Sequence, residues 1–474
     1  MLATGLALVI GAAVASRLSP SLFYAAGLLL LAMLGWAAWR WPRVLLVGLV
    51  LSPIIDRYLV AVLVADGLRA ATTYFSEALL LVVGAPAIAR AVLERRLQSG
   101  LWHPANGLLL AVCVLGVASA LVNAVPPWIA AAGLLFTLEA TTLFSLARLT
   151  PFSERQASGA AAAFVVVGGL AALLAMGQVL LHPNFLGLGT FAGRFGEGYR
   201  VASFLVSPNM LGALLAMGLP FTVLAALQLD GRPRLGAWAL AGLLSLALLY
   251  TFSRGAWLAV AGAMLVVAIV VDRRVLPAML LLGVLTFATA ILLPRHLLSA
   301  ERDQQPFDLI DATLGRIQAI GEGSDLRVQY IDNALPIIAD HPILGAGPGR
   351  YGGAVARTYG SPLYRQYTAG TVPATQTVDN FWLHQVVEQG VLGVLAFAAA
   401  MAVPIRQALV AARRATGRRR VLLAASAATG LVAAIASLAE MLLEGNTTSF
   451  ATWFFLGVAT TLAVERPQEG EAPQ

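Results

Sequence analysis

Long apolar segments follow one another along most of the chain and are separated by short polar turns. Each segment holds roughly 17–24 residues, near the ~20 that a helix needs to cross the hydrocarbon core of a bilayer. The segments that we predict to be helices are 2–18, 21–38, 43–60, 75–93, 106–122, 128–148, 158–181, 209–228, 235–252, 255–272, 276–293, 380–403, 421–441 and 448–464. The pattern predicts an all-α protein, a polytopic transmembrane helix bundle of about 12–14 helices.

Two polar stretches are too long to be simple turns. They cover 182–208 and 294–379, and long loops in compact proteins are usually functional or disordered. We expect short amphipathic helices on the outer membrane face in the first part of the second stretch, from Arg302 to Ile337, followed by an irregular lid rich in Gly, Pro, Tyr and Thr. The chain then divides into 1–293, with transmembrane helices 1–11 and the outer loop 182–208; 294–379, a large outer loop; and 380–474, with the C-terminal transmembrane helices and a cytoplasmic tail.

The composition agrees with a membrane protein. Hydrophobic residues make up 59% and charged residues 12% of the 474 residues, and the mean hydropathy is +0.80. Soluble domains have roughly 45–50% apolar and 25% charged residues, so a cytosolic enzyme, a disordered chain and a secreted disulfide scaffold are excluded. The single cysteine, Cys113, and the absence of paired histidines at helical spacing favour neither a metal site nor a cofactor.

The net charge of +7 is best explained by membrane topology. Arginine supplies all the basic residues and concentrates in alternate loops, as the positive-inside rule requires if both termini are cytoplasmic. The loops 182–208 and 294–379 then lie on the outer face. We expect no nucleic-acid partner.

The first polar stretch carries two arginines before a helix start. Arg194 and Arg200 precede Ser207-Pro208-Asn209, with serine as the expected cap and proline in the first turn. A helix N-terminus beside fixed positive charges is an anion site. The alternative is a capped helix with two arginines that reach the membrane surface.

Ser253-Arg254-Gly255 forms a tight turn between two predicted helices. An arginine at the membrane boundary is unfavourable unless it is paired or faces a wet cavity, and a guanidinium fits phosphate oxygens. The alternative is a turn residue that faces lipid headgroups.

The large outer loop contains Arg327 and a glycine-rich stretch with Gly345, Gly347 and Gly349. Backbone amides in such a loop can approach an anionic ligand. A turn packed on the membrane is the alternative.

The helix after the large loop opens with polar residues. Asp379 is the expected N-cap, and Asn380, His384 and Glu388 are spaced by four, so they share one helix face. A carboxylate and an imidazole can supply a general base. The alternative is a cap with buried polar packing.

Together, these stretches predict an outward-facing site for a lipid that carries phosphate or diphosphate. Over roughly residues 70–465 the sequence resembles the bacterial O-antigen ligase and O-antigen polymerase superfamily. The resemblance rests on Arg200 with Ser207-Pro208-Asn209-Met210-Leu211-Gly212, on Ser253-Arg254-Gly255, on Asp340-His341-Pro342-Ile343-Leu344-Gly345-Ala346-Gly347-Pro348-Gly349, and on Asn380 with Leu383, Glu388, Gly390 and Gly393.

The resemblance implies an inverting, metal-independent membrane glycosyltransferase of the GT-C type that takes part in lipopolysaccharide biosynthesis. An undecaprenyl-diphosphate-linked oligosaccharide is the implied donor, a glycan or lipid A–core hydroxyl the acceptor, and the periplasmic side of the bacterial inner membrane the location. Arg200 and Arg254 match arginines that hold the donor diphosphate, and we add Arg194 and Arg327. The supporting residues that we expect are Asn209, Ser253, Gly347, Asn380 and Glu388.

One position departs from the family pattern. Ligases of this kind carry His-Asn where this chain has Asp379-Asn380, and that histidine is their proposed base. Either Asp379 or His384 takes the role here, and a polymerase of the same superfamily remains an alternative. A transporter or flippase for a lipid-linked sugar requires ionisable residues within the membrane, for which Glu139 and Glu440 are the candidates. A structural membrane subunit leaves the large outer loop unexplained.

Overall fold

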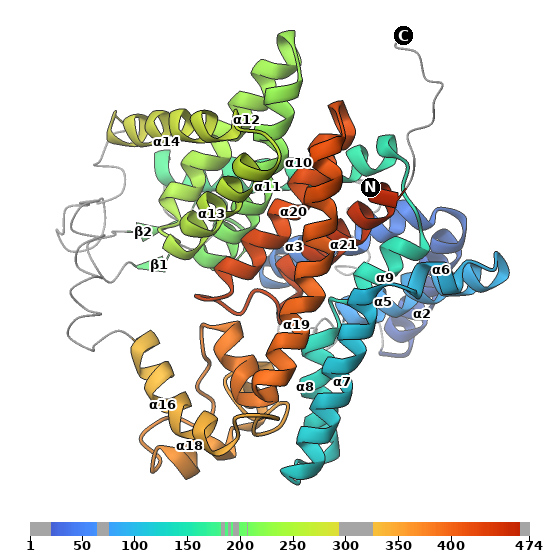
Figure 1. The fold of residues 1–474 in the computed structure, drawn as a ribbon, viewed down its shortest axis with the longest axis vertical. Coiled ribbons are helices and arrows are strands. Elements are labelled where there is room, and N and C mark those ends of the chain that lie inside the picture. Colours follow the sequence, from blue (N-terminus) through green and yellow to red (C-terminus); the bar gives the residue numbers. More distant parts are fainter. Residues whose placement is uncertain are drawn as a thin grey trace.

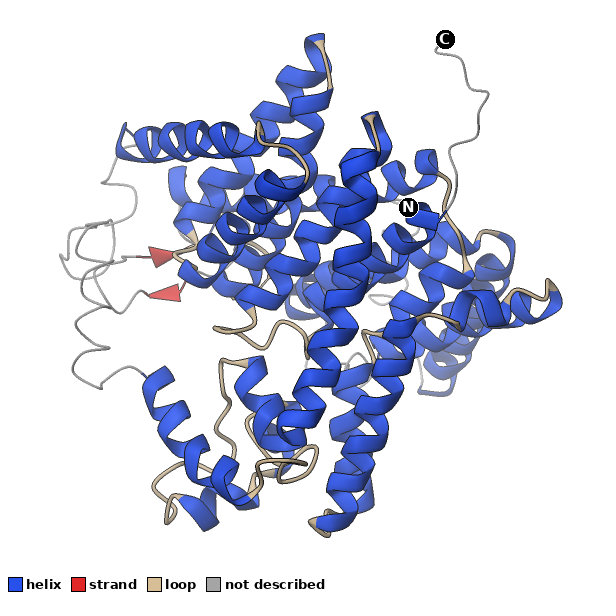
Figure 2. Ribbon diagram, viewed as in Figure 1, coloured by secondary structure: helices blue, strands red, loops and turns tan. Residues whose placement is uncertain are grey.

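The computed structural model describes residues 20–63, 75–181, 185–187, 191–192, 199–205, 207–292 and 326–464. The predicted segment 2–18 and Arg194 lie outside these residues. Helices make up most of the described chain (Figure 2), and its strands are two short antiparallel ones, β1 (Phe191–Ala192) and β2 (Tyr199–Arg200).

The helices correspond to the apolar pattern of the sequence. In chain order they are α2 (Pro20–Arg40), α3 (Pro42–Leu63), α5 (Phe75–Leu93), α6 (Leu97–Leu101), α7 (Pro104–Val122), α8 (Pro127–Leu138), α9 (Thr142–Leu149), α10 (Glu154–Leu180), the 3₁₀ turn η2 (Phe185–Gly187), α11 (Pro208–Gln228), α12 (Gly231–Tyr250), α13 (Arg254–Val270), α14 (Val275–Leu292), α16 (Leu326–Asp340), α17 (Ala354–Tyr359), α18 (Pro362–Tyr367), α19 (Phe381–Arg414), α20 (Gly417–Ala436) and α21 (Asn446–Val464).

Eight helices of the described chain are long and apolar enough to span a membrane: α7, α10, α11, α12, α14, α19, α20 and α21. The pair α8 and α9 adds a ninth if it forms one span, bent by 52°. The all-α polytopic fold is therefore confirmed. Helix α16 overlaps the part of the large loop where short helices are expected, whereas α17 and α18 lie in the part predicted to be an irregular lid, and that prediction is wrong for these residues. Figure 1 shows α16 and α18 at the end of the molecule where α7 and α8 also end, and α17 packs against α8.

Helix α11 is buried on nearly all sides and fixes the centre of the bundle. It packs against α10, α12, α13, α20 and α21. Its sequence is apolar all round, which is typical of a helix without a solvent or lipid face. Gly212 in its first turns permits close packing, since a Cβ atom there would lie 2.7 Å from the Cβ atom of Ser253. The first turn of α11 and the start of α13 are thus held together.

The long helix α19 is interrupted at Gly390, which has φ of 63°. Because the helix breaks there, the carbonyl groups of Val387 and Glu388 accept hydrogen bonds from the amides of Ala346 (2.8 Å) and Gly347 (3.0 Å). A Cβ atom on Gly390 would lie 2.3 Å from the carbonyl oxygen of Ile343, so glycine is required by space as well as by conformation. The break anchors the glycine-rich stretch of the large loop onto α19.

Candidate functional site

Arg200 connects the end of α12 with the start of α11. Its Nε atom donates a hydrogen bond to the carbonyl oxygen of Thr251 at 2.9 Å, and its Nη2 atom donates to Oδ1 of Asn209 at 2.5 Å. Ser207 occupies the predicted N-cap position of α11 and is followed by a proline, but its side chain makes no capping hydrogen bond. In the first turn of α11, the side chain of Asn209 is thus the group that contacts Arg200.

Asn209 also contacts a residue far along the chain. Its Nδ2 group donates a hydrogen bond to Oε1 of Glu440, in the turn between α20 and α21. The same carboxylate oxygen lies 3.6 Å from Nη2 of Arg327, and Arg327 donates to the carbonyl oxygen of Ala439 at 3.0 Å. One carboxylate thus lies between two of the predicted arginines.

Arg254 is the first residue of α13 and follows the buried N-cap residue Ser253. The next residue, Gly255, packs against the same turn that carries Glu440, because a Cβ atom on Gly255 would lie 3.0 Å from the Cβ atom of Ala439. The structure therefore brings the start of α13 to the turn that Arg327 contacts.

Asp379 lies beside this turn as well. The amide of Phe381 donates to the carbonyl oxygen of Ser437 at 2.9 Å. The N-cap of α19 is Asn380, whose Oδ1 accepts from the amide of Leu383 at 3.0 Å, so the prediction that Asp379 caps the helix is wrong. The Asp379 carboxylate is thereby not used as the cap.

The carboxyl group of Glu440 is a much weaker acid than an ordinary glutamate. Burial raises its pKa to about 8, and the negative charge of Asp379 acts in the same direction. The positive charges of Arg327 and Arg200 and the hydrogen bond from Asn209 lower the pKa but do not outweigh these effects. The amide of Phe381 also lies 3.3 Å from the carbonyl oxygen of Glu440, so the backbone brings Asp379 close to this residue.

The transporter hypothesis names Glu440 as a candidate residue within the membrane, and the structure does not place it in a spanning helix. Helix α20 ends at Ala436, whereas the apolar pattern runs on to residue 441. Because the helix ends earlier, Glu440 lies in a turn with the arginines and not inside a span. In the sequence, the position of Glu440 is indicated by a carboxylate at the end of an apolar segment, next to a predicted outer turn.

We call the residues gathered at this turn the arginine cluster. Its members are Arg200, Asn209, Arg254, Arg327, Asp379 and Glu440. They come from five separate regions of the chain, and the described part of the protein holds no group of three or more His, Cys, Asp or Glu residues suited to a metal ion. The cluster itself gathers three arginines at one turn, and guanidinium groups suit an anion.

His384 and Glu388 lie about one and two helical turns after the N-cap residue Asn380, in a different environment. Both are almost fully buried, at 2% and 1% exposure, and their side chains are 3.7 Å apart. Nδ1 of His384 lies 2.5 Å from the carbonyl oxygen of Tyr351. The two residues share a helix face, as their spacing predicts, but this face is covered by the glycine-rich stretch.

The amides of that stretch are engaged by the protein itself. The Glu388 carboxylate accepts from the amides of Gly349 and Tyr351, each at 2.7 Å. The amide of Gly347 donates to the carbonyl oxygen of Glu388. The prediction that amides of the glycine loop approach a ligand is therefore wrong for these residues, and Gly347 serves to pack the loop against α19.

Comparison of the sequence with protein-family models identifies one similar family. Residues 239–398 match the model of a family described as O-antigen ligase. The chain is thus similar to the O-antigen ligases. No curated protein matches the sequence significantly. The confirmed resemblance is to the O-antigen ligase and polymerase superfamily, and it agrees with the one inferred from the motifs.

The O-antigen ligase match covers part of the arginine cluster. Arg254, Arg327 and Asp379 lie within the matched residues, as does the glycine-rich stretch with α19 up to residue 398. Arg200, on β2, and Glu440 lie outside the match and join the cluster only through the fold. Residues inside and outside the matched range therefore both contribute to the arginine cluster.

Proposed function

We propose that this protein is an O-antigen ligase-like glycosyltransferase, which transfers a glycan from an undecaprenyl-diphosphate donor to an acceptor hydroxyl. The observation that carries the proposal is the arginine cluster. Arg327 contacts the carboxylate of Glu440 directly and Arg200 contacts it through Asn209, while the packing of Gly255 on the same turn places the start of α13, with Arg254, next to it. We place the cluster on the periplasmic side of the bacterial inner membrane, in line with the arginine distribution of the loops.

The arginines fit the charge that develops during transfer. When the bond between the sugar and the diphosphate breaks, negative charge collects on the departing undecaprenyl diphosphate. Guanidinium groups fixed before the reaction stabilise this charge, as a metal ion does in other enzymes. This mechanism uses side chains of the protein alone.

Asp379 is our proposed base. Its position beside Glu440 puts it in the arginine cluster, whereas His384 is buried beneath the glycine-rich stretch with Nδ1 on a backbone carbonyl. The acceptor oxygen attacks the anomeric carbon from the face opposite the diphosphate, and the carboxylate of Asp379 takes the hydroxyl proton. The configuration at the anomeric carbon is inverted.

Glu440 is a positioning residue in this proposal. Its hydrogen bond to Asn209 orients the amide that holds Arg200, and its contact with Arg327 holds a second arginine. With a pKa of about 8, its carboxyl group is mostly protonated at neutral pH, so it cancels little of the positive charge.

The test is transfer by the purified protein in liposomes that contain an undecaprenyl-diphosphate oligosaccharide and a chelator, with and without lipid A–core. A single-step shift that requires lipid A–core supports the ligase. A ladder without added acceptor indicates the polymerase alternative. An intact donor in both reactions contradicts the glycosyltransferase, and a flipping assay then tests the transporter.

A further inference from the structure

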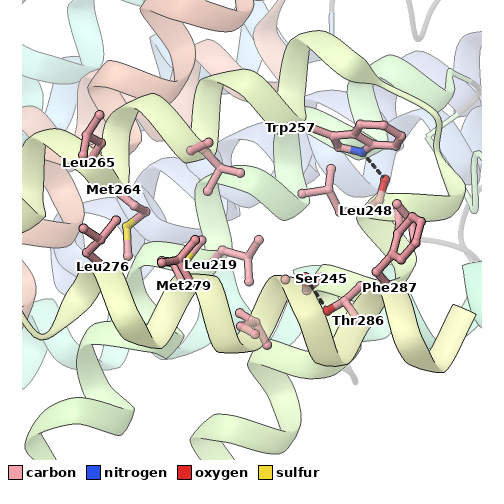
Figure 3. Close-up of a pocket in the computed structure, with 16 residues that line it drawn as sticks. Leu219, Ser245, Leu248, Trp257, Met264, Leu265, Leu276, Met279, Thr286 and Phe287 are labelled. Carbon is pink, nitrogen blue, oxygen red and sulfur yellow. Dashed lines mark hydrogen bonds between the residues drawn. The ribbon is translucent and has the colours of Figure 1, made fainter. Parts of the chain in front are cut away.

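Two hollows in the described part of the protein differ in their chemistry. The groove between α13 and α14 is lined mainly by apolar side chains, and its hydroxyl-bearing residues, Ser245 and Thr286, are hydrogen-bonded to each other at 2.9 Å (Figure 3). A smaller pocket of about 120 Å³ lies where α5 ends, and we call it the α5 pocket. Its lining includes Arg43, Arg90, Glu94, Arg96, Thr150 and Pro151. Of these two hollows, the α5 pocket is the one whose side chains can recognise a charged ligand.

The α5 pocket has an excess of positive charge. Three guanidinium groups and one carboxylate line it, so three positive charges and one negative charge leave a net +2. Nε of Arg96 donates a hydrogen bond to Oε2 of Glu94 at 2.8 Å, and Nε of Arg90 lies 3.5 Å from Oε1 of the same carboxylate. The hydrogen bond from Arg96 lowers the pKa of Glu94, so this carboxylate is charged at neutral pH. The pocket thus already binds one anionic group of the protein and keeps positive charge for a second.

Arg43 presents the donors that a ligand can use. Its Nε atom donates to the carbonyl oxygen of Pro151 at 2.8 Å, which fixes the side chain in the pocket wall. Within the described chain no residue accepts a hydrogen bond from its two Nη atoms, whereas Arg90 and Arg96 each use Nη1 for a backbone carbonyl. Two neighbouring N–H groups in a rigid fork match the oxygens of a phosphate group.

Exposed tryptophans place the α5 pocket at the membrane surface. Trp36, Trp39 and Trp41 have exposed side chains at the junction of α2 and α3, next to Pro42 of the pocket lining. The guanidinium group of Arg90 lies 5.9 Å from the centre of the Trp39 ring. Tryptophan concentrates at the level of the lipid headgroups. The pocket is therefore within reach of the phosphate of a membrane lipid.

The α5 pocket and the arginine cluster lie at opposite ends of the bundle. Glu154, which closely follows the pocket residue Pro151, lies 3.6 Å from Arg419 near the start of α20. Glu440 follows the other end of α20, a helix of 20 residues that is about 30 Å long. A lipid bound in the pocket therefore belongs to the leaflet opposite the arginine cluster.

We propose that the α5 pocket binds the phosphate group of an anionic phospholipid. The inference does not depend on the proposed glycosyltransferase function, which uses residues at the other end of the bundle. A phosphodiester with a net negative charge fits a pocket of charge +2, whereas the same arginines repel the ammonium group of a zwitterionic lipid. A soluble phosphate compound shares the phosphate chemistry, and the neighbouring tryptophans favour the lipid.

Three substitutions separate the charge of the pocket from its packing. Arg43→Gln removes the fork that faces the ligand. Glu94→Gln keeps an oxygen acceptor for Arg96 and removes the negative charge that competes with the ligand. Arg155→Gln is the matched control, because Arg155 is an exposed arginine of α10 near the same end of the bundle and does not line the pocket.

The measurement is photolabelling of the full-length protein in phosphatidylcholine nanodiscs that contain increasing fractions of phosphatidylglycerol with a diazirine beside its headgroup. Peptide mass spectrometry quantifies the label on residues 39–43 and 86–96, so binding elsewhere is not counted. We expect saturable labelling in the wild type. Arg43→Gln should require about fivefold more phosphatidylglycerol for half-saturation, the usual effect of one arginine near a charged membrane surface. Glu94→Gln should require less, and Arg155→Gln should match the wild type.

Four results would overturn the proposal. Equal labelling by phosphatidylcholine with the same diazirine shows that the pocket does not select an anion. Labelling of Arg43→Gln at the level of Arg155→Gln shows that the fork does not bind the lipid. A loss in Glu94→Gln as large as in Arg43→Gln shows that intact ion pairs matter and positive charge does not. Suppression of the labelling by an equimolar amount of glycerol phosphate assigns the pocket to a soluble phosphate compound.

Discussion

Replacing Glu440 tests whether this carboxyl group positions the arginines. Glu440→Ala removes the acceptor for Asn209, which holds Arg200, and the partner of Arg327. Glu440→Gln keeps an oxygen acceptor of the same size and removes only the ability to carry a negative charge. The two variants therefore separate the hydrogen bond from the charge.

The magnitudes follow from the contacts. A hydrogen bond of this kind contributes about 1 kcal/mol. The contact with Arg327, whose side chain is 36% exposed, adds little at neutral pH, because the Glu440 carboxyl group is mostly protonated and solvent screens the contact. We expect Glu440→Ala to lower kcat/KM for the donor by about fivefold, which corresponds to roughly 1 kcal/mol. Glu440→Gln, which keeps an acceptor for Asn209, should lower it by about twofold or less.

The pH profile provides an independent readout. As the pH rises through about 8, the wild-type carboxyl group loses its proton, and a negative charge appears beside Arg200, Arg327 and Asp379. Donor binding should weaken across this range in the wild type and stay constant in Glu440→Gln. Because the raised pKa means that the folded protein keeps a proton which the unfolded chain releases, wild-type stability should also fall between about pH 4.5 and 8.

The assay is steady-state transfer in liposomes from pH 6 to pH 9, roughly one to two units around the expected transition. Thermal inactivation of the same preparations reports stability. If Glu440→Ala retains wild-type kcat/KM, or if Glu440→Gln shows the same weakening of donor binding near pH 8 as the wild type, the positioning role is refuted.

Three further predictions concern the rest of the site. Arg200→Lys should lower donor affinity by about tenfold, because lysine keeps the charge but cannot contact Asn209 and phosphate oxygens as a fork; donor KM measures this, and an unchanged KM contradicts it. Glu388→Ala should lower the free energy of unfolding by roughly 2–5 kcal/mol, because two buried amides lose their acceptor. Thermal unfolding measures this, with Glu154→Ala as an exposed control, and equal melting temperatures refute the proposed role of Glu388 in holding the loop. Asp379→Asn should lower kcat far more than KM, by about a hundredfold or more, while His384→Gln should not reproduce this effect; the reverse ranking assigns the base to His384.

Much of the fold is encoded in the hydrophobic pattern. The positions of α7, α10, α11 and α12 follow from apolar runs bounded by proline, glycine or polar residues. The pattern is less informative about helix ends in alanine-rich segments, because alanine fits both a span and a turn. This is why the predicted segment 421–441 includes Glu440, although α20 ends at Ala436.

The sequence likewise predicts one part of the candidate site and not the other. Arg200 and Arg254 flank helices that begin on the same predicted side of the membrane, so topology alone indicates that they can meet. The roles of Glu388 and Gly347 depend on the break of α19 at Gly390, which frees carbonyl groups for the large loop. Such a break depends on contacts between distant segments and is not predicted by helical spacing. The spacing did correctly predict that His384 and Glu388 share one face of the helix.

The most direct test of the arginine cluster is transfer by Arg254→Ala in liposomes that contain undecaprenyl-diphosphate oligosaccharide and lipid A–core. Arg365→Ala is the control, because Arg365 is an exposed arginine of α18 outside the cluster. The account predicts that Arg254→Ala inserts and folds normally but loses about a hundredfold or more in transfer, the typical effect of removing one group that stabilises developing negative charge. Transfer by Arg254→Ala at the level of Arg365→Ala and the wild type would contradict the claim that these arginines bind the donor diphosphate.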